Sequence, residues 1–123
     1  MEKVYSRPES LDISNNKFCP GCMHSTFIKI CMQVIDELGI GDRAVVIQPI
    51  GCANNSSPCI AIDQGCALHG RAPAYATGLK RCHPESIVFT YQGDGDLSSI
   101  GFAEVMHAAN RGENICVFYI NNC

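Results

Sequence analysis

The stretch IVFTYQGDGD, residues 87–96, decides how this 123-residue chain folds. Its first half is a run of β-branched and aromatic residues, which predicts a buried strand over residues 87–91. The Gly93-Asp94-Gly95-Asp96 segment that follows predicts a tight turn, in which both glycines take positive φ and let the backbone approach a ligand closely. This arrangement favours a ligand site, because open parallel sheets bind ligands at the carboxyl ends of their strands.

Downstream of the turn, the sequence predicts one more helix and one more strand. Apolar residues recur at helical spacing, and Gly112 provides the C-terminal cap. A second apolar run predicts a strand over residues 115–120, which leads into Asn121-Asn122. The residues expected on the buried side of the helix are Phe102, Val105, Met106 and Ala109.

Upstream of the turn, strands and helices alternate in the same way. Apolar spacing predicts a helix from about Ser25 to Gly39, and a β-branched run predicts a strand over residues 44–48. A long polar loop is expected to follow as far as Gly70, and then a helix over residues 71–82. The apolar stripe of the first helix is Phe27, Cys31, Val34, Ile35 and Leu38. This alternation predicts an α/β fold in three layers, a parallel sheet with helices on both faces.

Composition limits the class of protein. The formal net charge is −3 and Lys and Arg are not clustered, so we expect no nucleic-acid partner. No apolar run approaches the roughly 18 to 20 residues that cross a bilayer, so we expect no membrane span. The N-terminus lacks the apolar centre of a signal peptide, which favours the cytoplasm. Residues 1–17 are expected to be an irregular leader to a single domain over residues 18–123.

Nine cysteines are unusual for such a chain. The number is odd and no export signal is present, so metal ligation is favoured over disulfides. Cys31 and Cys116 fall within a helix stripe and a strand, where we expect them to act as small core residues. The Cys19-Pro20-Gly21-Cys22 turn brings two thiols together, and Cys52 could supply a third. These residues alone leave open zinc, an iron–sulfur cluster or a thioredoxin-like redox pair.

Asp94 and Asn122 follow two strands that one helix connects, so they are expected at the same sheet edge. Mg²⁺ prefers oxygen ligands and usually shares them with phosphates. A carboxylate from Asp94 and an amide oxygen from Asn122 suit that ion. The amides at the start of the helix after the turn would face a phosphate.

The order of these motifs resembles a known family. Gly-Asp-Gly followed after one helix and strand by Asn-Asn resembles the thiamine diphosphate signature. Five segments together resemble the β subunit of 2-oxoacid:ferredoxin oxidoreductases, from about Phe18 to Asn122. These segments are FCPGC at 18–22, IGC at 50–52, HGRA at 69–72, ATGLK at 76–80 and YQGDGDL at 91–97.

The resemblance implies three cofactors, namely thiamine diphosphate, Mg²⁺ and one [4Fe–4S] cluster. It implies that Asp94 and Asn122 bind Mg²⁺, and that Cys19, Cys22 and Cys52 bind the cluster. The fourth cluster ligand and a further magnesium ligand lie past Cys123 in the family, so we expect an incomplete thiamine diphosphate-binding fold, from a fragment or a split gene. The residues implied in cofactor binding are Gly51, Cys52, His69, Gly93, Asp94, Gly95, Asp96 and Asn122.

The implied activity is that of an EC 1.2.7 enzyme of anaerobic metabolism. It would decarboxylate a 2-oxoacid oxidatively to acyl-coenzyme A and CO₂, with electrons passing through the cluster to ferredoxin. The family's activating glutamate lies on a partner subunit, so this chain offers no assigned catalytic residue, although His69 is a candidate. The implied partners are an α subunit with γ and δ subunits. The HGRAPA stretch at 69–74 most resembles enzymes for branched-chain substrates such as 2-oxoisovalerate, with pyruvate and 2-oxoglutarate as alternatives.

Two other functions stay open. The chain could be an iron–sulfur or zinc module without thiamine chemistry, or an inactive truncated product. Met23 and Ser25 stand where the family commonly has glycine, which affects how closely this helix could approach a cofactor. Cys59 and Cys66 are alternative fourth thiolates.

Overall fold

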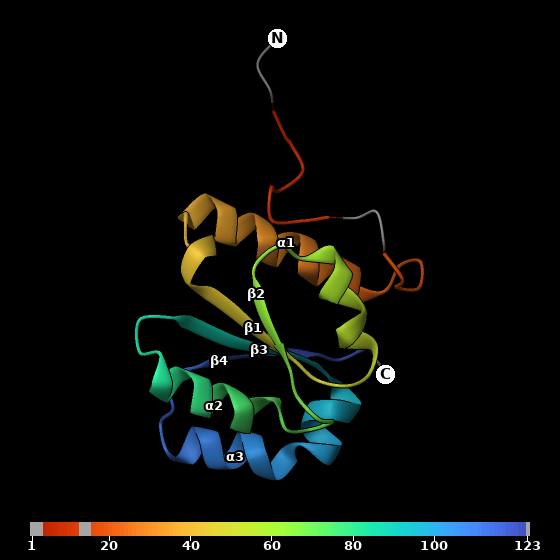
Figure 1. Ribbon diagram of the computed structural model, residues 1–123. Coiled ribbons are helices and arrows are strands. Elements are labelled where there is room, and N and C mark those ends of the chain that lie inside the picture. Colours follow the sequence, from red (N-terminus) through yellow and green to blue (C-terminus); the bar gives the residue numbers. More distant parts are fainter. Residues whose placement is uncertain (1–3, 13–15, 123) are drawn as a thin grey trace.

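Four parallel strands form one sheet in the order β2-β1-β3-β4. The computed structural model describes residues 4–12 and 16–122. Figure 1 shows α1 and η2 over one face of this sheet and α2 with α3 over the other, which confirms the three-layer α/β fold. The elements are α1 (Met23–Leu38), η1 (Gly41–Arg43), β1 (Ala44–Gln48), η2 (Cys52–Cys59), β2 (Asp63–Cys66), α2 (Ala72–Cys82), β3 (Ile87–Gly93), η3 (Gly95–Ile100), α3 (Phe102–Asn110) and β4 (Cys116–Ile120).

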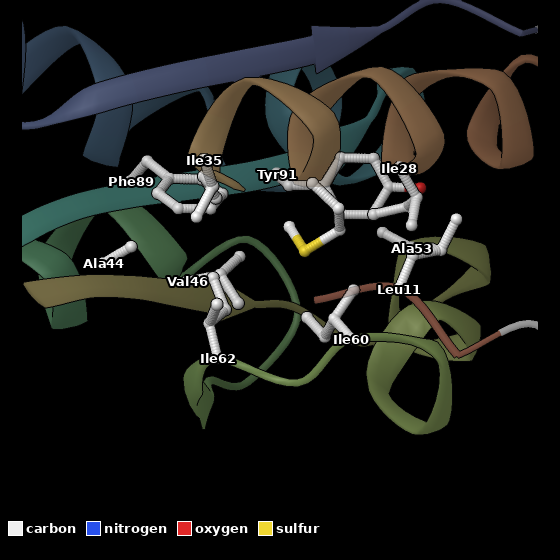
Figure 2. Packing of buried hydrophobic residues seen from close by; sticks show 11 residues of the cluster. Leu11, Ile28, Ile35, Ala44, Val46, Ala53, Ile60, Ile62, Phe89 and Tyr91 are labelled. Carbon is white, nitrogen blue, oxygen red and sulfur yellow. The ribbon is translucent and has the colours of Figure 1, made fainter. Parts of the chain in front are cut away.

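The main core lies between α1 and the sheet. Figure 2 shows side chains of α1 packed against those of β1 and β3, with Leu11 and Ile60 closing one side. Within α1 the buried apolar residues are Ile28, Met32 and Ile35. The predicted buried stripe was therefore partly wrong, because Val34 and Leu38 are exposed. This helix carries apolar residues on several of its sides, so spacing alone did not identify the buried face.

The predicted polar loop between residues 52 and 70 was wrong. This segment holds the 3₁₀-helix η2 and the strand β2, which pairs with β1 from Val45↔Asp63 to Gln48↔Cys66. The sequence of β2 is Asp-Gln-Gly-Cys, and most of it is exposed. An edge strand without a buried face carries no apolar alternation, so its sequence does not distinguish it from a loop.

The predicted buried side of α3 was also wrong. Phe102 and Met106 are 56% and 53% exposed, Val105 is half-buried and Ala109 is exposed, while Ala108 is the buried residue. A small residue at this position suits close packing of α3 against α2, which lie side by side in Figure 1.

The two cysteines expected in the core differ. Cys31 packs against the main core, and burial raises the pKa of its thiol to about 11, with a smaller effect from Cys116. Cys116 is exposed, because it begins the edge strand β4. The core prediction is therefore confirmed for Cys31 and wrong for Cys116.

The N-terminal segment is tied to the domain. Leu11 is buried and forms an antiparallel bridge with Ile60. The amide of Asp12 donates to the Cys59 carbonyl at 2.8 Å, and the amide of Ala61 donates to the Ser10 carbonyl at 2.9 Å. Across the described ranges, no helix combines the length and the apolar character needed to span a membrane.

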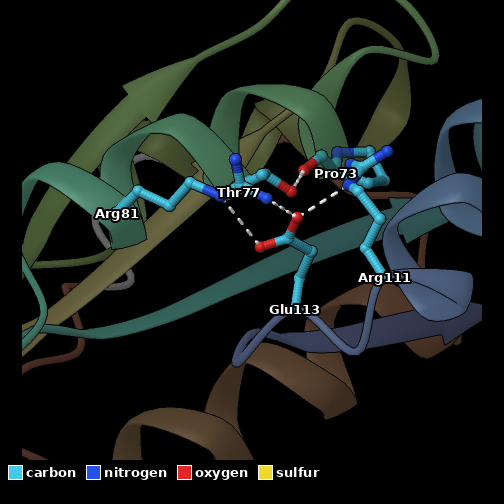
Figure 3. A network of polar contacts seen from close by, with 5 residues as sticks. All are labelled: Pro73, Thr77, Arg81, Arg111 and Glu113. Carbon is cyan, nitrogen blue, oxygen red and sulfur yellow. Dashed lines mark hydrogen bonds and ion pairs between the residues drawn. The ribbon is translucent and has the colours of Figure 1, made fainter.

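A charged contact joins α2 to the turn after α3, at the end of the sheet opposite Gly93. Figure 3 shows Arg81 and Arg111 converging on Glu113. The two guanidinium groups donate hydrogen bonds to this carboxylate, Arg111 at 2.7 Å and Arg81 at 2.5 Å. These bonds, first from Arg111 and then from Arg81, lower the pKa of Glu113.

We expect Glu113→Gln to make the chain less stable at neutral pH and less sensitive to acid. A carboxyl whose pKa is lowered by folding stabilises the fold above its unfolded pKa, and this contribution is lost as the pH falls through the folded value. Urea unfolding at neutral pH and at about pH 3 measures both effects. The exposed Glu85, changed to Gln, is the control. Parallel pH profiles for Glu113→Gln and the unmodified chain would contradict the prediction.

Candidate functional site

The carboxyl ends of the strands gather most of the predicted site residues. Figure 1 shows η2, the start of α1, η3 and the C-terminal end of the chain on this one side of the sheet. β1 ends just before Gly51 and Cys52, and β3 ends at Gly93 beside Asp94. Asn122 follows the end of β4. The parallel sheet therefore brings together segments that are far apart in the sequence.

The backbone at Gly93 and Gly95 differs from the predicted turn. β3 continues to Gly93, Asp94 is helical with φ −60° and ψ −45°, and the π-helical segment η3 begins at Gly95. Neither glycine is among the described glycines with positive φ. A Cβ placed at Gly95 would meet nothing within 4 Å, and one at Gly93 would come no nearer than 3.8 Å to another residue. Gly95 thus has open space beside it, Gly93 lies at ordinary contact distance from His24 and Asn122, and the expectation of positive φ was wrong.

Asn122 faces the end of β3. A Cβ at Gly93 would lie 3.9 Å from Asn122 Oδ1, so the amide oxygen points toward the segment that carries Asp94. Asp94 is half-buried and Asn122 is exposed. The carboxylate of Asp94 and the amide oxygen of Asn122 are ligand types that a hard divalent cation prefers.

Asp96 is bonded within the protein. Its carboxylate is buried, and Oδ1 accepts a hydrogen bond from the Gly70 amide at 2.8 Å and contacts His69 Nδ1. The other oxygen accepts a hydrogen bond from the Gln92 side chain. Asp96 therefore fastens the His69-Gly70 segment to η3, and its carboxylate holds protein groups in place.

His69 lies at the rim of the site. Its side chain is 41% exposed, and its Nδ1 lies against the Asp96 carboxylate. The neighbouring Arg71 pairs with Glu104 of α3, so its guanidinium stabilises the contact between the loop and α3.

The first cysteine pair lies on a defined turn. The amide of Cys22 donates to the Cys19 carbonyl at 3.0 Å, and Gly21 has φ +78°. Pro20 followed by a glycine with positive φ is typical of a type II turn. This turn holds Cys19 and Cys22 on one side of the chain, immediately before α1.

Cys52, the third predicted thiol, shares the surroundings of Tyr91 with Cys22. Burial raises the pKa of the Tyr91 hydroxyl, and the thiols of Cys22 and Cys52, followed by those of Cys31 and Cys59, add to this shift. Tyr91 thus has Cys22 and Cys52 within its electrostatic surroundings. Cys52 follows Gly51, whose φ of +114° favours glycine. Cys19 and Cys52 are exposed and Cys22 is half-buried.

The alternative fourth thiols differ in environment. Cys59 is buried, and burial raises the pKa of its thiol, which disfavours the thiolate. Cys66 is exposed at the end of β2, with its sulfur 4.0 Å from Asn54 Oδ1. Within the described part of the chain, no three His, Cys, Asp or Glu side chains lie close enough to hold a single metal ion.

His24 is a site residue that the sequence prediction missed. It lies in the first turn of α1, is 1% exposed, and joins its Nδ1 to the Tyr91 hydroxyl. Burial lowers its pKa, and the carboxylate of Asp94 opposes that shift. Its ring stacks on Phe18, with ring centroids 5.4 Å apart. Its position two residues after Cys22 could have indicated a role in the site. A single histidine at the start of a helix forms no recognisable motif, however, so the sequence prediction did not include it.

Comparison with known proteins gives consistent matches. Residues 39–123 match the family described as thiamine pyrophosphate enzyme, C-terminal TPP binding domain, where thiamine pyrophosphate is another name for thiamine diphosphate. The chain is 43% identical over 131 aligned positions to ketoisovalerate oxidoreductase subunit VorA of Methanothermobacter thermautotrophicus, covering 98% of this chain. It is 33% identical to 2-oxoglutarate synthase subunit KorB of Methanocaldococcus jannaschii over 85% of this chain.

A solved structure has the same fold. The match is to 2-oxoglutarate:ferredoxin oxidoreductase from Magnetococcus marinus, with a TM-score of 0.87 and 29% identity. It covers 96% of this chain and 41% of that one. The chain spans 28% of the VorA protein and 39% of the KorB protein. The matched region is therefore a part of each of these longer proteins.

Proposed function

Because this chain belongs to the C-terminal TPP-binding domain family of thiamine pyrophosphate enzymes, we propose that it binds the diphosphate end of thiamine diphosphate through Mg²⁺. The chain is also homologous to subunits of 2-oxoacid:ferredoxin oxidoreductases, which supports the same proposal. The observation that carries this proposal is the meeting of polar side chains at the end of β3. There, Asn122 Oδ1 and His24 Nε2 would lie 3.9 and 3.8 Å from a Cβ at Gly93, the residue just before Asp94.

The donor set fits the cofactor. Asp94 and Asn122 would bind Mg²⁺ through oxygen, the ligand type this ion prefers. The backbone at Gly93, Gly95 and Gly51 would lie against the diphosphate, because a glycine presents no side chain there. Asp96 would act indirectly, since its oxygens already hold His69, Gly70 and Gln92.

Cys19, Cys22 and Cys52 are proposed to bind an iron–sulfur cluster of the [4Fe–4S] type. Two of these thiols share a turn, and Cys22 and Cys52 lie near the same buried Tyr91. A cluster holds several iron atoms and spreads its thiolates more widely than a single ion does. The fourth ligand is proposed to be a thiolate from a part of the protein outside this chain. If this chain itself supplied the ligand, the exposed Cys66 would be preferred to the buried Cys59.

The whole protein is proposed to decarboxylate a 2-oxoacid oxidatively, with coenzyme A as acyl acceptor and ferredoxin as electron acceptor. When bound, thiamine diphosphate supplies the electron sink that this chemistry needs. This chain's residues would bind and orient it, and the activating glutamate would come from a partner subunit. A branched-chain substrate is preferred, because identity is 43% to a ketoisovalerate enzyme subunit and 33% to a 2-oxoglutarate enzyme subunit.

Thermal unfolding with and without Mg²⁺ and thiamine diphosphate tests the cofactor proposal. We expect stabilisation that needs both ligands, of about 2.7 kcal/mol at one hundred times the Kd. Anaerobic reconstitution with iron and sulfide tests the cluster. It should give the broad visible absorption of a [4Fe–4S] cluster, which Cys22→Ser should abolish and the control Cys82→Ser should preserve.

The outcomes separate the alternative functions. Cluster absorption without any response to thiamine diphosphate would favour an iron–sulfur module, and tight zinc binding with no cluster would favour a zinc module. A chain that binds none of these ligands, alone or with its partner subunits, would be an inactive product. Any of these three results would overturn the proposed function.

A further inference from the structure

The side chain of His24 has one nitrogen that the protein does not use. Among the described residues, Nε2 is buried and has no hydrogen-bond partner. A Cβ at Gly93 would lie 3.8 Å from this atom and 3.9 Å from Asn122 Oδ1. Nε2 therefore lies beside Gly93, as the amide oxygen of Asn122 does. A buried polar nitrogen without a partner costs free energy, so it calls for a ligand atom.

The contact with Tyr91 determines which nitrogen of His24 carries the proton. Tyr91 is fully buried, and within the described ranges its hydroxyl has no hydrogen-bond partner other than His24 Nδ1. A buried hydroxyl needs an acceptor for its proton, so Tyr91 donates to Nδ1. In a neutral imidazole the proton then lies on Nε2. The atom beside Gly93 is therefore a donor.

A hydrogen-bond donor at this position requires an acceptor atom. Mg²⁺ is unsuitable because a protonated nitrogen has no free lone pair and because this ion prefers oxygen. The backbone points to the same charge: α1 begins at Met23 with no side-chain cap and no acidic residue in its first turn. The positive end of this 16-residue helix thus lies beside Nε2 and favours an anion.

We propose that His24 is a further binding residue of this site, whose Nε2–H donates a hydrogen bond to an anionic oxygen of the bound diphosphate. This inference rests on the proposed function, because it takes the diphosphate to lie at Gly93 and Asp94. His24 would then connect two parts of the site, with Tyr91 near the thiols of Cys22 and Cys52 on one side and the diphosphate on the other.

Calorimetric titration of the full chain, with its partner subunits where binding needs them, tests this role. The probes are Mg²⁺ with thiamine diphosphate and Mg²⁺ with inorganic pyrophosphate. His24→Phe keeps a ring between Phe18 and Tyr91 but removes the donor. We expect it to weaken both ligands by a similar factor, about tenfold to a hundredfold. His24→Gln retains an N–H donor and should recover part of the loss, and the exposed His107, changed to Gln, should bind as the unmodified chain does.

The results distinguish the two proposals. If the unmodified chain binds neither ligand, the proposed function fails. If the unmodified chain binds both and His24→Phe binds equally well, only the role of His24 is wrong. Weaker binding of thiamine diphosphate with unchanged binding of pyrophosphate would place His24 against the rings and would also overturn the inference.

The tautomer of His24 can be measured independently of any variant. Long-range proton–nitrogen NMR correlations of the imidazole distinguish a protonated Nε2 from a protonated Nδ1. We expect a protonated Nε2 in the unmodified chain, and a shift of its signal when Mg²⁺ and pyrophosphate are added. A protonated Nδ1, or an Nε2 signal that does not respond to pyrophosphate while the ligand binds, would contradict the proposal. This measurement decides the matter even if His24→Phe fails to fold.

Discussion

Asp94→Asn is expected to abolish the stabilisation of this chain by Mg²⁺ and thiamine diphosphate while leaving its fold intact. The substitution keeps the size of the side chain and removes the negative charge that would bind the ion. Loss of an outer-shell partner alone typically weakens a metal site about 10- to 100-fold, so loss of a direct ligand should weaken it by at least about a hundredfold. Thermal unfolding with both ligands, compared with unfolding without them, measures the effect.

The matched control for this prediction is Asp63→Asn. Asp63 is an exposed carboxylate at the start of β2, at the other end of the strands from Gly93. The control should respond to Mg²⁺ and thiamine diphosphate as the unmodified chain does. If Asp94→Asn retained the full response, Asp94 would not be a magnesium ligand, and the diphosphate would have to lie elsewhere.

The central part of the fold was predictable from sequence because it is buried on both faces. β1 and β3 are buried runs composed mostly of apolar residues, and α2 ends just before His83 and Pro84, so their positions match the prediction closely. The parallel order followed from the alternation of strands and helices. The family resemblance on five short segments is likewise confirmed by the matches to known proteins.

The periphery was not predictable, because exposure removes the pattern on which prediction depends. β2 has no apolar face, and its pairing with β1 is determined by backbone hydrogen bonds. Phe102 and Met106 are apolar but exposed, so a rule that places apolar residues inside assigned them to the wrong face. Apolar periodicity identifies a face only when that face is buried, and neither β2 nor the side of α3 that carries Phe102 and Met106 is buried in this chain.

The sequence predicted which strand end carries the proposed site residues, but it did not predict their conformation. Gly93 and Gly95 lie at the predicted strand end, but they do not take positive φ. The contacts of the Asp96 carboxylate with His69 and Gly70 were not predicted, and its role in cofactor binding stays a prediction. His24 was missed because its role depends on Tyr91, which lies 67 residues away in sequence. Contacts of this kind arise only once the sheet has formed.

The largest effect on stability is expected at Gly70, where the His69-Gly70 segment meets η3. Gly70 has φ +77°, and a Cβ there would lie 2.7 Å from the Ile100 side chain and 2.8 Å from the backbone nitrogen of Gly101. A Cβ at Gly101 would in turn lie 2.7 Å from the Gly70 carbonyl oxygen. Both backbones therefore need glycine at this crossing, where the Gly70 amide also donates a hydrogen bond to Asp96.

We expect Gly70→Ala to destabilise the chain by about 3 kcal/mol or more, since left-handed strain costs about 1 to 2 kcal/mol and overpacking about 1 to 3. Two other glycines separate these causes. Gly39 has φ +61° with nothing within 4 Å, so Gly39→Ala should show the strain alone, about 1 kcal/mol. Gly78, inside α2, has neither positive φ nor a close neighbour, so Gly78→Ala should stabilise by about 0.5 to 1 kcal/mol.

Urea unfolding of these three variants beside the unmodified chain measures each free energy of unfolding. The order of stability should be Gly78→Ala, then the unmodified chain, then Gly39→Ala, with Gly70→Ala last. Gly70→Ala should also lower the Tm by about 10 °C or more. If Gly70→Ala and Gly39→Ala lost equal free energies of unfolding, the backbones of Gly70 and Gly101 would be able to move apart without cost. In that case close packing at the crossing would not help Asp96 to hold the His69-Gly70 segment against η3, and the hydrogen bond from the Gly70 amide would have to hold it alone.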